Sequence, residues 1–285
     1  MKKILVTGSN GQLGSEICSL ASDFSDFEFV FTDRSQLSLA TTEAIPDFLN
    51  TLQPEFIINC AAYTAVDKAE SEPELADLIN HISVGVIAKW CYENNANLIH
   101  ISTDYVFDGS SPAPLTEKDK TNPQNEYGKT KLKGENTCFS ENPESIIIRT
   151  SWVYSEFGNN FVKTMLRLMK ERDTLNVVND QIGSPTYARD LAKAILEIIR
   201  QRKWRGGIYN FSNEGEISWF DFAIAIKEIA GLQCNVQGIP SSEFPTPAKR
   251  PAYSLLNKSK IKETFGIKVP HYRNSLEECL QKMKV

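Results

Sequence analysis

Short apolar runs alternate with longer segments along the first half of the chain. The runs are rich in Ile, Val and Phe and show no polar alternation: residues 4–7, 27–32, 56–61, 98–102 and 146–150. Runs of this kind are typical of parallel strands that are covered on both faces. The segments between them carry apolar residues at helical spacing: residues 15–24, 42–52, 74–94 and 126–139. The pattern predicts an α/β fold, a doubly wound parallel sheet with helices on both faces.

The alternation becomes irregular after about residue 150. Further helices are predicted at residues 159–170, 188–202, 218–230 and 275–283, and a short strand at residues 208–211. Ser218 is a suitable N-cap, and four prolines between residues 240 and 251 predict an irregular connection. We expect one domain over residues 1–150. Residues 151–285 would then form a smaller, partly discontinuous lobe, with some segments returning to the first domain.

Composition and charge narrow the class of protein. Of 285 residues, 41% are hydrophobic and 24% charged, as in an average globular protein. Acidic residues exceed basic ones by 36 to 31 and no dense basic run is present, so nucleic acid is not an expected partner. No apolar stretch approaches the about 20 residues of a membrane-spanning helix. The six cysteines lack the spacing of a metal site, and we expect them to be reduced, in a cytoplasmic protein without a metal.

A glycine-rich loop joins the first predicted strand to the first predicted helix. It has the spacing GxxGxxG and contains Gly8, Asn10, Gly11, Gln12, Leu13 and Gly14. Residues without a Cβ allow a sharp turn, close approach of a diphosphate and tight helix–strand packing. The helix amino end offers N–H groups and a positive dipole end to the phosphates. A plain turn has the same pattern, but the position after the first strand favours a dinucleotide site.

Two residues at the end of the second predicted strand bear on the choice of cofactor. Asp33 lies about 20 residues beyond the loop, where an acid usually accepts a hydrogen bond from the adenosine ribose 2′-hydroxyl, which favours NAD. Arg34 could instead pair with a 2′-phosphate, which favours NADP. The sequence leaves both cofactors open.

Polar groups at other strand ends predict a catalytic set. Thr103 ends the fourth strand, at the sheet edge where ligands bind. Tyr127 and Lys131 are four residues apart and share a helix face. A nearby ammonium stabilises a phenolate, so we expect Lys131 to lower the pKa of Tyr127. A YxxxK pair alone is common in helices, but its place beside Thr103 and the glycine loop favours a catalytic role.

Several longer blocks are more specific than the YxxxK pair: residues 59–70, 102–109, 127–135, 149–154, 180–186 and 250–251. With them, the chain resembles the extended short-chain dehydrogenase/reductase family, with a Rossmann-like fold, over nearly its whole length. Within that family it is most similar to the branch of dTDP-4-dehydrorhamnose reductases.

The resemblance implies a reaction and roles. NADPH or NADH would reduce the 4-keto group of dTDP-4-dehydro-6-deoxy-L-mannose to give dTDP-L-rhamnose, for cell-surface polysaccharides. By similarity, Tyr127 donates the proton, Lys131 tunes Tyr127 and binds the nicotinamide ribose, and Thr103 hydrogen-bonds the keto oxygen. Further cofactor contacts would come from Tyr127, the glycine loop and the strand ends: Gly8, Asn10, Gly11, Gln12, Leu13, Gly14, Asp33, Arg34, Cys60, Ala61, Ala62 and Tyr63.

The sugar nucleotide would be held by a second set of residues. Trp152, which follows the fifth strand, is a candidate apolar wall for the sugar, or a plain core residue. Arg250 is a candidate for a bidentate grip on the diphosphate, or a solvated surface residue. The remaining candidates for substrate contacts, besides Thr103, are Thr64, Asp104, Tyr105, Asn160 and Thr186.

Two departures from the family pattern affect the expectations. Ser38 stands where members commonly carry Asp, which concerns details of cofactor binding. Some members dimerise through acidic side chains and magnesium; Glu16 fits that pattern, but Arg189 stands where a second acid is expected. We therefore expect a monomer or weak homodimer without a bridging metal.

Two other functions stay open. One is a nucleotide-sugar epimerase or dehydratase of the same superfamily; dehydratases usually add acids beside the threonine, whereas Tyr105 follows Asp104 here. The other is a non-catalytic subunit like the regulatory subunit of methionine adenosyltransferase, which the intact Thr103, Tyr127 and Lys131 disfavour.

Overall fold

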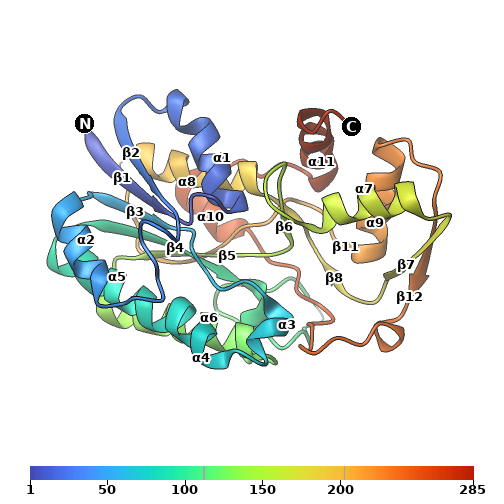
Figure 1. The fold of residues 1–285 in the computed structure, drawn as a ribbon, viewed down its shortest axis with the longest axis horizontal. Coiled ribbons are helices and arrows are strands. Elements are labelled where there is room, and N and C mark those ends of the chain that lie inside the picture. The colour runs from blue at the N-terminus through green and yellow to red at the C-terminus, as the bar shows by residue number, and fades with distance from the viewer. Residues whose placement is uncertain (112, 202) are drawn as a thin grey trace.

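A six-stranded, all-parallel sheet forms the centre of the computed structural model, which describes residues 1–111, 113–201 and 203–285 (Figure 1). The strand order is β10-β5-β4-β3-β1-β2. Their bounds are β1 (Lys2–Thr7), β2 (Phe27–Thr32), β3 (Phe56–Asn59), β4 (Asn97–Thr103), β5 (Ile146–Thr150) and β10 (Gly207–Asn210). From β1 the chain builds outward to β2 and then reverses to β3, so a topological switch point lies between β1 and β3.

Helices cover both faces of the sheet, as the apolar runs predict. One face packs against α1 (Gln12–Leu20), α8 (Ala188–Arg200) and α10 (Ser259–Phe265). The other packs against α2 (Ala44–Leu52), α5 (Ser83–Glu93) and α6 (Glu126–Glu141). Neighbouring strand residues serve opposite faces: Ile4 and Val6 join the first core, and Leu5 joins the second. The predicted fold class is confirmed.

The predicted helix over residues 74–94 is interrupted. Its region contains α4 (Pro73–Asp77), a π-helical turn (Leu78–Ile82) and α5. In the π turn the carbonyl oxygen of Asn80 lies against Gly134 of α6, where a Cβ would be only 2.1 Å away. The Asn80 side chain also accepts from the backbone N–H of Tyr63 and donates to the hydroxyl of Thr130. The wider turn thus lets Asn80 connect three segments near the sheet edge.

A second hydrophobic core lies beyond the sheet, at the right of Figure 1. Its helices are α7 (Phe161–Glu171), α9 (Trp219–Ile229) and α11 (Tyr272–Lys282). Three two-stranded pairs join it: β6 (Val153–Tyr154) with β9 (Thr186–Tyr187), β8 (Ile182–Gly183) with β11 (Ile217–Ser218), and β7 (Thr174–Val178) with β12 (Asn235–Ile239). Ser218 caps α9 in a reciprocal arrangement with Asp221, as predicted for the N-cap.

The short strand pairs, the single turn α3 (Val66–Ala69) and α10 were not predicted from the sequence. Helices α8 and α10 and strand β10 come late in the chain but pack on the central sheet. None of the helices in the described ranges is both long and apolar enough to cross a lipid bilayer.

Candidate active site

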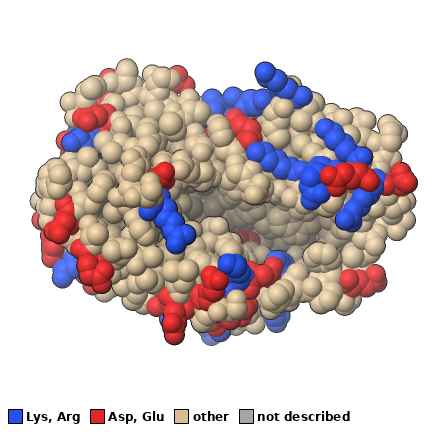
Figure 2. Space-filling view, viewed as in Figure 1, with Lys and Arg blue, Asp and Glu red and all other residues tan. Residues whose placement is uncertain are grey.

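A cavity of about 940 Å³ opens beyond the carboxyl ends of β1, β3, β4 and β5. In the space-filling view it is the hollow in the middle of the molecule (Figure 2). This is the crevice where open α/β sheets bind their ligands. Most of the predicted site residues line it: Gly8, Asn10, Gly11, Gln12, Leu13, Asp33, Arg34, Cys60, Ala61, Ala62, Tyr63, Thr64, Thr103, Asp104, Tyr105, Tyr127, Lys131 and Trp152.

The glycine loop forms a cradle that side chains would fill. Gly8 has a φ of +65°, and a Cβ there would lie 2.8 Å from the backbone nitrogen of Ala61. A Cβ on Gly14 would lie 2.4 Å from the carbonyl oxygen of Gly8. Gly11 is the N-cap of α1 and provides no side-chain cap, so the cavity meets an open helix amino end. The cradle fits a dinucleotide diphosphate; Gly14 serves it through packing and lies outside the cavity lining.

Asp33 is held in place at the far end of this cradle. Its Oδ1 accepts from the backbone N–H and the hydroxyl of Ser35 at 2.8 and 2.6 Å, and its Oδ2 accepts from Asn10 at 2.8 Å. The hydrogen bonds from Ser35 lower the pKa of Asp33, so the carboxylate is ionised at neutral pH. Arg34 is exposed beside it and also lines the cavity. The structure therefore brings both cofactor-selecting candidates to one place.

Thr103, Tyr127 and Lys131 all line the cavity. Thr103 ends β4, where its hydroxyl accepts from the backbone N–H of Tyr105 and donates to Asp104 Oδ1 at 3.1 Å. Tyr127 and Lys131 come from the first turns of α6, whose N-cap Asn125 accepts from the backbone N–H of Gly128. All three side chains of the set are buried and line the cavity, in an environment from which bulk water is largely excluded.

The expected lowering of the Tyr127 pKa is wrong for this structure. Burial raises the pKa of Tyr127 to about 12, and a hydrogen bond with Thr103 offsets only part of that effect. Lys131 directs its Nζ to the carbonyl oxygen of Ile101 at 2.6 Å, and burial lowers its pKa to about 8. Tyr127 is therefore a protonated phenol at neutral pH, which is the state that a proton donor requires.

Known proteins of one family match this chain from end to end. Residues 1–285 match the family described as RmlD substrate binding domain. A dTDP-4-dehydrorhamnose reductase of Aggregatibacter actinomycetemcomitans is 41% identical over 287 aligned residues, covering 97% of this chain and 98% of that protein. The chain belongs to the dTDP-4-dehydrorhamnose reductase family.

Solved structures of this family agree with the fold. A dTDP-4-dehydrorhamnose reductase from Clostridium acetobutylicum superposes with a TM-score of 0.95 at 43% identity, covering 99% of this chain and all of that one. A dTDP-4-dehydrorhamnose reductase from Bacillus anthracis, solved in complex with NADP, has a TM-score of 0.95 at 37% identity, with the same coverage. The family predicted from the sequence is thereby confirmed.

In this member of the dTDP-4-dehydrorhamnose reductase family, a row of buried polar side chains supports Lys131. The row was not predicted from the sequence. Thr7 of β1 donates to Asn59 Oδ1 at 2.6 Å, and the Asn59 amide lies 3.1 Å from His100 Nδ1. His100 Nε2 lies 3.3 Å from Lys131 Nζ. Burial and the charge of Lys131 hold the pKa of His100 well below its usual range, so the imidazole is neutral. The sequence did carry one signal for this row, a polar residue near the end of each of three adjacent strands.

A second buried polar group under the site is an ion pair. Arg149 of β5 donates from Nε and Nη2 to both oxygens of Glu135 in α6, at 2.9 and 2.6 Å. Their side chains are only 3% and 1% exposed. Ser102 of β4 donates to Glu135 Oε1 at 2.5 Å. The pair fixes α6, and with it Tyr127, against β4 and β5.

Three predicted substrate contacts lie outside the cavity lining. Asn160 caps α7, and its amide donates to Gln12 Oε1 and to the carbonyl oxygen of Ser155. Thr186 is fully buried and shares a hydrogen bond with Thr150. Arg250 is mostly buried, and Asp67 binds its guanidinium at 3.2 and 2.9 Å. Each of these three side chains therefore has hydrogen-bond partners within the protein.

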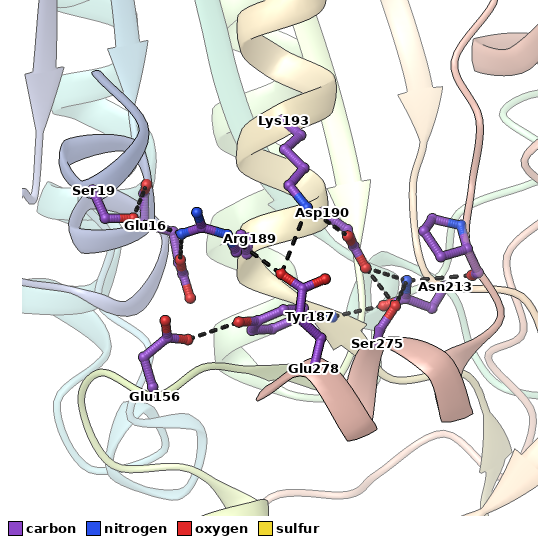
Figure 3. A network of polar contacts seen from close by, with 11 residues as sticks. Glu16, Ser19, Glu156, Tyr187, Arg189, Asp190, Lys193, Asn213, Ser275 and Glu278 are labelled. Atoms are coloured by element: carbon purple, nitrogen blue, oxygen red, sulfur yellow. Dashed lines mark hydrogen bonds and ion pairs between the residues drawn. The ribbon is translucent and has the colours of Figure 1, made fainter. Parts of the chain in front are cut away.

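Glu16 belongs to a network that ties α1 to the second lobe (Figure 3). Its buried carboxyl accepts from Ser155 at 2.7 Å and from Arg189 at 3.3 Å. Arg189 also lies 3.5 Å from Glu278 of α11. Burial and the neighbouring Glu156 raise the pKa of Glu16 to about 8, so Glu16 keeps its proton at neutral pH. Arg189 thus supplies, from within the chain, the positive charge that this acidic group needs.

Proposed function

We propose that the chain reduces the 4-keto group of dTDP-4-dehydro-6-deoxy-L-mannose to give dTDP-L-rhamnose, with NADPH or NADH as cofactor. The observation that carries the proposal is the convergence of Thr103, Tyr127 and Lys131 on one cavity whose other end is the glycine cradle. Family membership supports the substrate class, since the three relatives described above carry the name dTDP-4-dehydrorhamnose reductase.

The chain's own residues hold the cofactor. The loop from Gly8 to Gly14 receives the diphosphate at the amino end of α1, and Asp33 and Arg34 receive the adenosine ribose. Lys131 and Tyr127, which line the same cavity, would hold the nicotinamide ribose. When bound, the reduced nicotinamide supplies the hydride.

The catalytic side chains donate the proton and stabilise the charges that its transfer creates. Tyr127 keeps its proton at neutral pH and donates it to the C4 oxygen as the keto group becomes an alcohol. Thr103 can turn its single hydroxyl hydrogen from Asp104 to the same oxygen and so stabilise the charge that develops there. Lys131, in its ammonium form, stabilises the phenolate that Tyr127 leaves behind. Asp104, Tyr105, Thr64 and Trp152 surround the sugar.

The assay that tests this function follows NADPH and NADH absorbance with dTDP-4-dehydro-6-deoxy-L-mannose and identifies the product. We expect one cofactor oxidised per dTDP-L-rhamnose formed. A changed sugar without net cofactor consumption would instead show an epimerase or dehydratase. Cofactor binding without turnover of any nucleotide sugar would favour a regulatory subunit.

Arg34→Ala is expected to raise the KM for NADPH about tenfold and to leave the KM for NADH within twofold. Arg34 borders the cavity beside Asp33, and of the two cofactors only NADPH carries a 2′-phosphate that it could bind. Steady-state kinetics with both cofactors measure the ratio of the two KM values. Arg167→Ala, at an exposed helical ion pair on α7, is the control. Equal changes for the two cofactors would contradict the role of Arg34.

We further propose a monomer or weak homodimer in the cytoplasm. Arg189 supports the first part, because its positive charge already contacts Glu16 and Glu278, which disfavours a bridging cation at these side chains. Light scattering should then give the same molar mass with EDTA and with magnesium.

The six cysteines support the second part, the cytoplasm. They are all unpaired, which fits a reducing compartment.

A further inference from the structure

Trp152 adopts a backbone conformation that is strained for its type. Its φ is +47°, in the left-handed region that residues other than Gly rarely adopt. It lies between the end of β5 and the start of β6, and its carbonyl oxygen accepts from the backbone N–H of Thr186 at 3.2 Å. Such strain persists when surrounding contacts hold the residue, and it concentrates at functional sites. The strained turn places Trp152 in the lining of the active-site cavity.

The contact that holds the Trp152 side chain comes from α9. The indole rings of Trp152 and Trp219 stack with centroids 3.8 Å apart and planes 16° from parallel. Trp219 is the first residue of α9, directly after the Ser218 cap, and its ring also packs against Phe161, with centroids 4.6 Å apart. The Ser218–Asp221 capping box fixes this helix end. The stack therefore rests on a rigid element of the second lobe.

Gly183 makes room for the same indole. A Cβ at Gly183 would lie 2.9 Å from Cζ2 of Trp152, closer than real Cβ atoms approach, and 3.1 Å from its Cε2. Gly183 lies in β8, which pairs with β11 immediately before α9. Neither Gly183 nor Trp219 lines the cavity, so both act on a ligand only through Trp152.

We propose that Trp219 is a positioning residue for the sugar, holding the Trp152 indole as a fixed wall of the sugar end of the cavity. The inference rests on the proposed function, which places the sugar beside Trp152. A wall already held in place loses little rotamer freedom when the sugar binds, so the stack raises affinity for the sugar moiety. The nucleotide moiety gains nothing from it.

The experiment compares binding of dTDP-L-rhamnose and of dTDP, by calorimetry, to the wild type, Trp219→Leu and Trp219→Phe. Trp219→Leu should weaken dTDP-L-rhamnose about tenfold, since the stack is lost, and leave dTDP within twofold. Trp219→Phe, which keeps a stacking ring, should recover most of the affinity. Gly183→Ala displaces the indole from another side and should also weaken only dTDP-L-rhamnose. Trp204→Phe, distant from the cavity, is the matched control.

Circular dichroism adds a readout that is independent of ligands. Two stacked indoles give an exciton couplet, which Trp219→Leu should abolish and Trp204→Phe should keep. Unchanged affinity for dTDP-L-rhamnose in Trp219→Leu, or equal losses for both ligands, would overturn the inference while leaving the proposed function intact. A wild type that binds dTDP but neither binds nor forms dTDP-L-rhamnose would contradict the proposed function itself, and the inference with it.

Discussion

Tyr127→Phe is expected to slow NADPH oxidation in a single turnover by roughly 10²–10⁴-fold, while NADPH binds as it does to the wild type. The substitution removes only the hydroxyl that donates the proton. The ring keeps its edge-to-face contact with Tyr105, at 5.6 Å between centroids. Because the lost interaction acts in the transition state, the effect belongs to the rate and not to affinity. Stopped-flow absorbance at saturating sugar nucleotide and a binding titration separate the two.

Tyr154→Phe is the matched control for this prediction. Tyr154 is a fully buried tyrosine of the second core, and its hydroxyl has no hydrogen-bond partner among the residues that the structure describes. Its replacement should leave the rate within twofold. A Tyr127→Phe variant that also keeps the wild-type rate would remove Tyr127 from the mechanism.

Arg149→Met is expected to lower the free energy of unfolding by about 3–5 kcal/mol. The substitution leaves the Glu135 carboxylate buried without its guanidinium, and the hydroxyl of Ser102 alone is a poor replacement. Urea unfolding at neutral pH gives the measurement. The double variant Arg149→Met/Glu135→Leu should recover much of the loss, because it removes the stranded charge as well.

Arg167→Met provides the comparison for an exposed pair. Arg167 lies 2.9 Å from Glu171, but both side chains are more than half exposed, so the loss should stay below about 1 kcal/mol. If Arg149→Met unfolded at the same urea concentration as Arg167→Met, the buried pair would not be what holds α6 on the sheet.

The sheet could be predicted from the sequence because its strands are continuous apolar runs. Residues 27–32 and 146–150 form β2 and β5 with the predicted bounds. The same logic predicted the edge at which Gly8, Cys60 and Thr103 gather, since parallel strands end on the same side. The longer sequence blocks indicated the family, which the periodicity of hydrophobic positions alone does not define.

The remaining features depend on contacts between distant segments. The π turn around Asn80 is set by close packing on Gly134, which no local pattern encodes. The pKa of Tyr127 was predicted from one neighbouring charge, whereas burial decides its direction in the fold. Nothing in the sequence indicated that Asp67, which is 183 residues from Arg250, would bind its guanidinium.

The central claim is that the Tyr127 hydroxyl gives its proton to the C4 oxygen while hydride is transferred. The most direct measurement is the single-turnover rate of NADPH oxidation by the wild type and Tyr127→Phe, in H₂O and in D₂O. We expect the wild type to slow in D₂O, and the variant to be slow in both solvents with a smaller solvent effect. A variant that matched the wild type in rate and in solvent isotope effect would contradict the claim.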